Sequence, residues 1–305
     1  MQQLNVLFLG FGSIANKHAH ALRRLFPAIQ LDALRSSVNN SEIEGVRSFY
    51  SYDDLDLQSY NFVIVSNPSF LHAESIIKIA KQTKAFFIEK PAFLNIDEGQ
   101  HVIESIGDKI NYVACNLRFL DCLQEVKRCL DEGLIRPIQA DFKAWSYLPD
   151  WRPSQDYRLS YSASISKGGG VLYDLIHEPD YIYWLFGKPI SSSVTSYKLS
   201  SLEIDSPDTA QIKFDYPSLS VTGSLSYASR VSKRTLNILA EDGLLEIDLI
   251  QNTILKNGIV VFQSSQRITD TYLAQMSHFL DCLINGKNPI NDVNQAMLIT
   301  ELLHF

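Results

Sequence analysis

The segment FFIEKPAF, residues 86–93, places a glutamate and a lysine directly after a run of apolar residues. Charged side chains usually avoid the end of a core strand, because burying a charge is costly unless a partner or a ligand compensates it. The ammonium of Lys90 can hydrogen-bond a single oxygen and stabilise negative charge that develops there. Pro91 restricts the backbone beside it. We therefore predict a functional lysine at position 90, with a strand-end salt bridge as the alternative.

A second chemical signal lies near the N-terminus, where the apolar run LNVLFLG leads into a turn and then a helical pattern that ends at Pro27. The turn has the form G-x-G-x-x-A. Gly10 would permit the tight turn, and Gly12 would let a pyrophosphate approach the backbone. Ala15 would let the helix pack closely on the strand, and N–H groups at the helix start would face the phosphate charge. The predicted cofactor-binding residues here are Gly10, Phe11, Gly12, Ser13 and Ile14.

The next expected strand, IQLDALR at residues 29–35, bears on the choice of cofactor. In NAD-binding proteins an acidic residue at this strand tip holds the ribose 2′-hydroxyl, whereas arginine and hydroxyl groups suit the 2′-phosphate of NADP. Asp32 falls inside the strand, three residues before Arg35. We expect Arg35 and Ser36 to contact the cofactor and to favour NADP over NAD. An ordinary solvated arginine is the alternative.

Two further strands are expected at residues 62–65 (FVIV) and 85–91 (AFFIEKP), separated by a helix at 72–82. The first is apolar throughout, as strands of a parallel sheet are when both faces are covered. Ligands of such sheets bind beyond the carboxyl ends of the strands. The residues expected at that edge are Ser66, Asn67, Pro68, Glu89 and Lys90.

Five motifs follow one another along nearly the whole chain: GFGSIA at 10–15, VSNPSFLHAE at 65–74, EKP at 89–91, CNLRF at 115–119 and GGGVLYDLIHEPDYIYWLFG at 168–187. In this order they resemble the Gfo/Idh/MocA family, named after glucose–fructose oxidoreductase and inositol dehydrogenase. The resemblance implies an α/β protein, with an N-terminal Rossmann dinucleotide-binding domain followed by an α+β domain that has an open, mostly antiparallel sheet. It also implies an NAD(P)-dependent enzyme that transfers a hydride to or from a hydroxyl or carbonyl of a sugar, inositol or sugar derivative.

The resemblance also assigns roles in the site. It places Lys90 beside the nicotinamide and the reacting oxygen, and the peptide bond before the proline of EKP is often cis in the family. Glu89 would orient Lys90 or contact the cofactor. His177 corresponds to the acid/base histidine of the family, and we expect it to face the same nicotinamide as Lys90. His72 corresponds to a family position near the cofactor.

Asp174 precedes His177 by three residues, whereas the common family spacing is D-x-x-x-H. On one continuous helix the two side chains would share a face and reach one hydroxyl. Pro179 makes an unbroken helix through 174–182 doubtful, because it cannot donate a hydrogen bond to the carbonyl of Leu175 and would clash with it. Asp174 is therefore either a catalytic partner of His177 or a cap.

Substrate contacts are expected from two other stretches. Asn116 and Arg118 fall in the N-x-R-F segment that the family uses near cofactor and substrate. The tract WSYLPDWRPSQDYR, residues 145–158, combines aromatic faces that suit sugar C–H groups with arginine forks that suit phosphate or carboxylate. We expect Trp151, Arg152 and Tyr157 to contact an amino, nucleotide-linked or acidic sugar; a covering loop is the alternative.

The remaining histidines and cysteines indicate no metal site. His18 and His20 lie two apart on the expected helix and point to different faces, so each is expected to be a core or surface residue. The four cysteines contain no C-x-x-C pair and fit buried thiols of a cytoplasmic protein.

Domain boundaries are expected at residues 1–118 and 119–305, with the last helix packing back near the first domain. The second part contains alternating segments such as AQIKFDY at 210–216, which predict strands. Family members commonly associate through the open sheet, so a homodimer or homotetramer is expected.

The net charge of −7 argues against a nucleic-acid partner, and no apolar run reaches the ~18 residues that a membrane helix needs. Two alternatives stay open: a cofactor-binding sensor that has lost catalysis, and a reductase of imines or double bonds in a non-sugar substrate.

Overall fold

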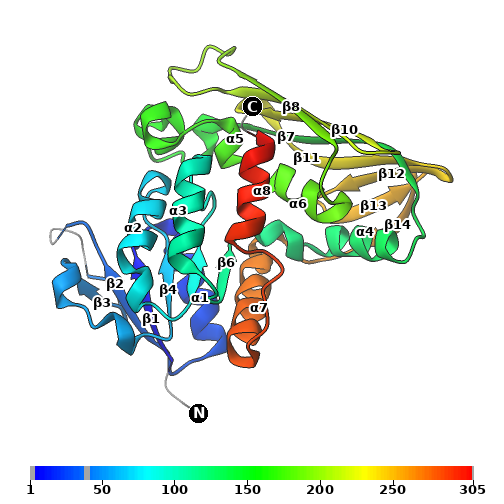
Figure 1. Cartoon of the computed structure of the whole chain (residues 1–305). Coiled ribbons are helices and arrows are strands. Elements are labelled where there is room, and N and C mark those ends of the chain that lie inside the picture. The colour runs from blue at the N-terminus through cyan, green and yellow to red at the C-terminus, as the bar shows by residue number, and fades with distance from the viewer. Residues whose placement is uncertain (1–3, 38–41, 304–305) are drawn as a thin grey trace. The chain divides into compact units, whose positions relative to one another are not determined.

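The computed structural model describes residues 4–37 and 42–303, which form two compact units (Figure 1). The first comprises Met1–Ala114 and Tyr272–Leu298, and the second comprises Cys115–Thr271 and Ile299–Phe305. This division has more than the one break expected after residue 118. Most of α7 (Thr271–Asn285) and the start of α8 (Val293–Leu303) belong to the first unit.

A six-stranded parallel sheet with the order β3-β2-β1-β4-β5-β6 forms the centre of the first unit. Its strands are β1 (Asn5–Leu9), β2 (Gln30–Leu34), β3 (Arg47–Phe49), β4 (Phe62–Val65), β5 (Phe86–Ile88) and β6 (Asn111–Val113). Val6, Leu7 and Phe8 of the central strand are fully buried, since both faces of the sheet are covered. The order is that of a doubly wound dinucleotide-binding domain, with a switch point between β1 and β4.

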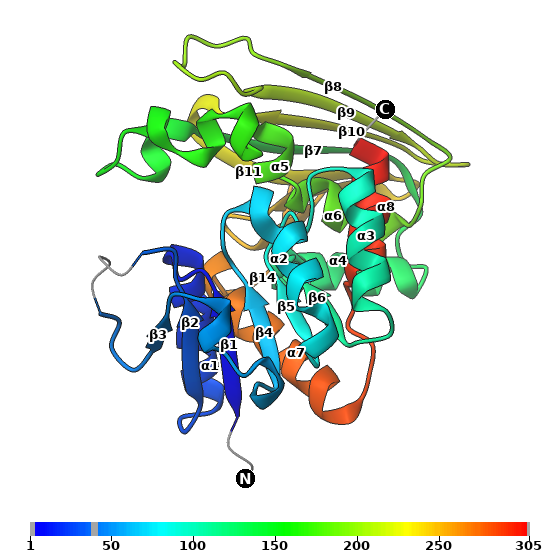
Figure 2. The same ribbon diagram turned by 60° about the vertical axis from the view of Figure 1, so that its left-hand side comes forward.

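Helices cover this sheet on both faces. Right-handed crossovers place α1 (Ser13–Leu25) on one face, and α2 (His72–Ile79) and α3 (Ile96–Ile106) on the other. Figure 2 shows α2 and α3 side by side. Helix α7 lies on the α1 face, because Tyr272 packs against His18 of α1 at a centroid distance of 5.9 Å. On the same face, Phe279 packs against Phe62 and Phe87 of the sheet at 5.0 and 5.4 Å. This arrangement leaves the carboxyl ends of β1, β4 and β5 at one edge of the sheet.

The second unit contains an eight-stranded sheet in the order β14-β13-β12-β11-β7-β10-β9-β8. Its strands are β7 (Pro137–Tyr147), β8 (Ser191–Tyr197), β9 (Thr209–Asp215), β10 (Ser220–Ser226), β11 (Ala228–Ala240), β12 (Gly243–Asp248), β13 (Thr253–Lys256) and β14 (Ile259–Gln263). Only the β7–β10 pairing is parallel among these strands. The expected open, mostly antiparallel sheet is confirmed.

Strand alternation gives this second sheet two different faces. One face packs against α4 (Asp121–Asp131), α5 (Val171–Asp174) and α6 (His177–Phe186). Exposed residues on the other face include Gln211, Lys213 and Thr222.

A close contact between two strands shapes the buried face. Phe142 of β7 lies opposite Gly223 of β10, and a Cβ atom at Gly223 would come 2.0 Å from Cζ of Phe142. The aromatic ring therefore occupies the space that a side chain at position 223 would need.

Among the described residues, the structure has no helix with the length and hydrophobicity required to cross a membrane.

Candidate active site

The turn after β1 has the geometry that phosphate binding requires. Gly10 has φ +78°, and a Cβ atom there would come 2.7 Å from Cα of Asn67, so only glycine fits without strain. Gly12 precedes the first residue of α1, and a Cβ atom there would meet no heavy atom within 4 Å. No side chain caps α1 and its first turn has no acidic residue, so the helix start is suited to an anion.

The residues around this turn also fit a dinucleotide. Ser66 donates a hydrogen bond from Oγ to the carbonyl of Gly10 at 3.1 Å, which ties the end of β4 to the turn. Asn67 donates from Nδ2 to Ser75 at 2.8 Å, whereas its Oδ1 is buried and accepts no hydrogen bond within the described part of the chain. That unpaired acceptor beside the glycine turn suits a ligand hydroxyl or amide. Phe11, Ser13, Ile14 and Pro68 lie along the same turn and the next one.

Asp32 is not at the ribose end of this site. It is fully buried inside β2, where Arg47 donates to both of its oxygens, at 3.2 and 2.6 Å. Tyr60 donates a third hydrogen bond at 2.7 Å. Arg35 follows the end of β2 and reaches Ser48 at 3.3 Å, and Ser36 is exposed. The strand tip therefore carries an arginine and a hydroxyl in place of a carboxylate.

Lys90 follows the end of β5 and is half-buried, and the Lys90–Pro91 peptide bond is cis. The preceding carboxylate of Glu89 is buried, and its Oε2 accepts a hydrogen bond from the backbone N–H of Lys90 at 3.3 Å. Its Oε1 lies 2.5 Å from Nε2 of His18, a fully buried residue of α1. Glu89 therefore contacts His18 with one carboxylate oxygen and the backbone of Lys90 with the other.

His72 links two segments of the same sheet edge. Its Nδ1 lies 2.8 Å from the carbonyl oxygen of Pro91, and its Nε2 lies 2.9 Å from that of Asn67. Burial lowers the pKa of His72, although the two carbonyl contacts oppose this effect. A neutral ring carries one N–H and donates to one carbonyl, whereas a protonated ring could donate to both.

His177 is the first residue of α6, and α5 ends at Asp174. The helix breaks at Leu175 and Ile176, so Asp174 and His177 do not share one helical face. Pro179 explains the break, because a proline is tolerated in the first turn of a helix and not in its interior. The doubt about a continuous helix is confirmed.

Asp174 is held by tyrosines of its own unit. The hydroxyl of Tyr227 donates to Oδ2 of Asp174 at 2.5 Å, and Asp174 is buried. Burial, and then the nearby carboxylate of Asp174, raise the pKa of Tyr161. Two phenols therefore surround this carboxylate, which suits a fixed structural acceptor more than a mobile proton carrier.

Arg118 and Asn116 are both buried in the second unit. Arg118 donates to both oxygens of Asp180, at 2.9 and 2.7 Å, and none of its side chain is exposed. Asn116 donates to the hydroxyl of Thr271 at 2.6 Å. The expected direct contact of Arg118 with substrate finds no support in this placement, because a buried bidentate pair already uses its guanidinium.

The three residues expected from the aromatic tract do come together. Trp151, Arg152 and Tyr157 line one shallow pocket. The indole of Trp151 packs edge-on against Tyr227 at 5.3 Å, and the guanidinium of Arg152 lies 5.7 Å from the ring centre of Tyr161. The pocket is thereby connected to the tyrosines that surround Asp174.

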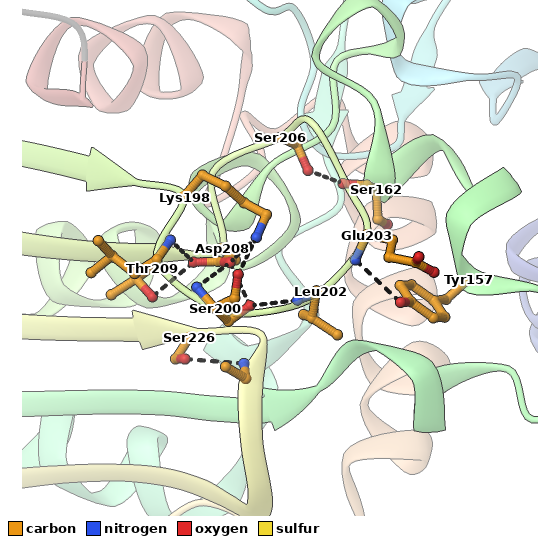
Figure 3. A network of polar contacts seen from close by, with 12 residues as sticks. Tyr157, Ser162, Lys198, Ser200, Leu202, Glu203, Ser206, Asp208, Thr209 and Ser226 are labelled. Atoms are coloured by element: carbon orange, nitrogen blue, oxygen red, sulfur yellow. Dashed lines mark hydrogen bonds and ion pairs between the residues drawn. The ribbon is translucent and has the colours of Figure 1, made fainter.

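The loop between β8 and β9 holds this tract in place (Figure 3). The backbone N–H of Glu203 donates to the Tyr157 hydroxyl at 3.2 Å, and Ser206 donates to the carbonyl of Ser162 at 2.6 Å. Asp208, fully buried, organises the loop by accepting hydrogen bonds from Leu199 N, Ser200 N and Ser200 Oγ. Burial alone would raise the pKa of Asp208, but these bonds and Lys198 outweigh it and lower the pKa to about 2.

Several residues that complete the site were not predicted from the sequence: His18, Tyr161, Asp180 and Tyr227. Only His18 left a signal, since it is a polar residue on the apolar stripe of the first helix. In the described ranges 4–37 and 42–303, no group of three histidine, cysteine or acidic side chains could hold a metal ion.

Relatives and solved structures resemble this chain over different shares of its length. A scyllo-inositol 2-dehydrogenase (NAD(+)) of Bacillus subtilis (strain 168) is 25% identical over 94% of this chain and 88% of its own. A 2,7-anhydro-N-acetylneuraminate hydratase of Escherichia coli (strain K12) is 31% identical over 44% of this chain and 35% of its own. The WlbA dehydrogenase of Bordetella pertussis, solved with NADH and UDP-GlcNAcA, shares the fold with a TM-score of 0.80 at 17% identity, over 98% of this chain and 93% of that one.

Two family models match consecutive parts of the chain. Residues 4–116 match the model described as "Oxidoreductase family, NAD-binding Rossmann fold", and residues 123–246 match the GFO/IDH/MocA C-terminal domain. The chain therefore belongs to the Gfo/Idh/MocA family of NAD-binding oxidoreductases.

Proposed function

We propose that this protein is an NAD(P)-dependent dehydrogenase or reductase acting on a hydroxyl or carbonyl of a sugar, inositol or sugar derivative. The observation that carries the proposal is the placement of Lys90. It follows a buried parallel strand at the same sheet edge as the glycine turn, with its backbone bonded to a buried carboxylate. The named dehydrogenases among its relatives support the choice of substrate class.

The roles of the side chains follow from their chemistry. The glycine turn after β1 would hold a nicotinamide dinucleotide, which would accept or supply the hydride when bound. The ammonium of Lys90 donates a hydrogen bond from Nζ to the substrate oxygen and stabilises negative charge on it. His177 takes the hydroxyl proton on a ring nitrogen during oxidation and returns it during reduction. Asp174, held by Tyr227, acts as a positioning residue near the start of α6.

A cofactor-binding test can separate the glycine turn from the rest of the fold. Gly12→Ala should fold as the wild type does, because its Cβ would meet no neighbouring atom, yet it should weaken cofactor binding by occupying space for the phosphate. NADH and NADPH fluorescence titrations measure this loss. His20→Ala, at an exposed position of α1 away from the turn, is the control, and equal loss in both variants would contradict the assignment.

We further propose that NADP is preferred over NAD. Asp32 is buried and already accepts three hydrogen bonds, so it does not offer a carboxylate to the ribose, whereas Arg35 and Ser36 follow the strand tip. Loss of a charge-assisted hydrogen bond should cost about 2 kcal/mol, so Ser36→Asp should reduce NADPH affinity by tenfold or more relative to NADH. Much tighter binding of NADH than of NADPH by the wild type would contradict the proposed preference.

The substrate class is tested by screening inositols, free sugars, sugar acids and nucleotide-linked sugars with the cofactor that binds. We expect turnover with at least one sugar-type compound and a reduced kcat/KM when Arg152 is changed to Ala, if that compound is acidic or phosphorylated. Turnover only with imines or enones would favour the alternative reductase.

We also propose a homodimer or homotetramer that forms through the open face of the second sheet. Light scattering on the purified chain measures the mass. Lys213→Glu on that face should shift the oligomer toward monomer, and a monomeric wild type at micromolar concentration would contradict the proposal.

A further inference from the structure

We propose that His18 is a positioning residue for Lys90 and acts through the buried carboxylate of Glu89. The inference deepens the proposed function, because it rests on Lys90 being the group that holds the substrate oxygen. His18 belongs to α1, the helix of the glycine turn, whereas Glu89 and Lys90 follow β5. The contact therefore joins the phosphate-binding helix to the catalytic segment.

The geometry fixes the imidazole on several sides. His18 has no exposed surface, and its ring packs edge-on against Phe87 and Tyr272 at centroid distances of 4.8 and 5.9 Å. Its Nε2 lies 2.5 Å from Oε1 of Glu89. A ring held by two aromatic neighbours has little rotational freedom, so the carboxylate that it binds is also fixed.

The surroundings of Nδ1 of His18 indicate which protonation form of the ring makes this contact. Nδ1 of His18 is buried and has no hydrogen-bond partner among the residues that the structure describes. A protonated ring would bury a second N–H there without an acceptor, which is costly. The neutral ring with its proton on Nε2 can donate to Glu89. It then leaves only an acceptor lone pair on Nδ1 without a partner, in place of a buried N–H. The pair then carries one negative charge, on the carboxylate.

That charge lies directly beside the lysine. Oε2 of Glu89 accepts the backbone N–H of Lys90 at 3.3 Å, so the orientation set by His18 is passed to the peptide that carries the ammonium. Titratable groups near this segment include His18 from α1 and His72 from α2. The charge of Glu89 raises the pKa of His72, and the charge of Lys90 lowers it. His18 therefore fixes the carboxylate that the backbone N–H of Lys90 contacts.

A double-mutant cycle tests the inference without relying on turnover. The pH dependence of Lys90 acylation is measured by competitive labelling and peptide mass spectrometry on the full chain without cofactor, in wild type, His18→Phe, Glu89→Gln and the double variant. We expect His18→Phe to displace the labelling midpoint of Lys90 by about half a pH unit or more, because the carboxylate loses its donor. In the Glu89→Gln background the same change should displace it no further.

Two companion variants sharpen the result. His18→Gln keeps an N–H donor and should return the labelling midpoint toward that of the wild type. His20→Phe, at an exposed position of the same helix, should leave it unchanged. If His18→Phe fails to fold, His18→Gln and Glu89→Gln still provide a comparison. The labelling midpoint of Lys90 should then differ from that of the wild type less in His18→Gln than in Glu89→Gln.

The inference would be overturned if His18→Phe shifted the labelling midpoint of Lys90 equally in the wild-type and Glu89→Gln backgrounds. It would also be overturned if a folded His18→Phe variant showed no shift. In turnover, we expect His18→Phe to lower kcat about tenfold and to leave the KM for cofactor within about twofold. If Lys90→Met keeps full turnover, the catalytic role proposed for Lys90 fails, while the labelling cycle still tests the contact of His18.

Discussion

The candidate residues of the two units are positioned in different ways. In the first unit they directly follow β1, β4 and β5, and the strands themselves bring them to one edge. In the second unit they lie on short 3-10 turns and on the break between α5 and α6. Side chains distant in sequence hold them there, such as Tyr227 on Asp174. Regular structure thus positions one set, and individual polar contacts position the other.

The largest effect is expected at Lys90. Lys90→Met removes the ammonium and should lower kcat about 10²- to 10³-fold, because a donor aimed at developing charge typically contributes about 3–4 kcal/mol. Binding of the cofactor should change by less than about threefold, since the glycine turn is intact. Lys84→Met, an exposed lysine just before β5, is the control and should keep full activity. Equal activity of the two variants would remove Lys90 from the mechanism.

Breaking the buried pair in the second unit should have the next largest effect. Arg118→Met leaves the carboxylate of Asp180 buried without its partner, so we expect the free energy of unfolding in urea to fall by about 3–5 kcal/mol. Arg118→Met with Asp180→Leu should recover most of this loss. Arg128→Met, at an exposed pair on α4, should cause no measurable change. A fully stable Arg118→Met that has only lost substrate affinity would restore Arg118 to the substrate site.

Asp208 tests whether the loop of Figure 3 depends on one charge. The folded state lowers its pKa to about 2, so its stabilisation is present above the ordinary carboxyl value and is lost as pH falls toward 2. Asp208→Asn should therefore reduce stability by about 1–2 kcal/mol at pH 7 and by almost nothing near pH 2. Thermal melts at both pH values measure this difference. Asp150→Asn, at an exposed site, should show no such pH dependence.

The smallest effect is expected at His72. Burial lowers its pKa in the folded state, so the unfolded chain takes up the proton first as pH falls below about 6.5. Stability due to this residue is therefore complete at neutral pH and declines toward pH 5. His72→Gln should flatten that decline by up to about 1 kcal/mol, whereas exposed His20→Gln should not. A steeper decline in His72→Gln would mean that the buried ring is protonated.

The sequence was most informative where function depends on backbone geometry. GFGSIA predicts the strand, turn and helix order, and the structure places Gly10 at positive φ against Asn67. The apolar runs before Ser66 and Glu89 predict parallel strands, so the common edge follows from topology alone. Pro179 likewise predicts the helix break, because its exclusion from a helix interior depends only on the local backbone.

Partners of polar side chains could not be predicted in the same way. Arg118 is 62 residues from Asp180, and His18 is 71 residues from Glu89. Asp32 illustrates the difficulty, since its distance from the glycines suits a ribose contact, yet Arg47 and Tyr60 bind it inside the sheet. Composition and periodicity show which residues are buried, but they do not show which buried polar group meets which other.

The ring of Phe142 over Gly223 has an evolutionary consequence. A side chain can arise at position 223 only after the ring at 142 has been replaced by something smaller, since both would occupy the same volume. A larger residue at 223 alone would clash with the ring of Phe142, and a smaller residue at 142 alone would leave a cavity, so either single substitution should be destabilising. We therefore expect homologous sequences to change these two positions together, so covariation between columns 142 and 223 should reveal the central parallel pairing of the second sheet.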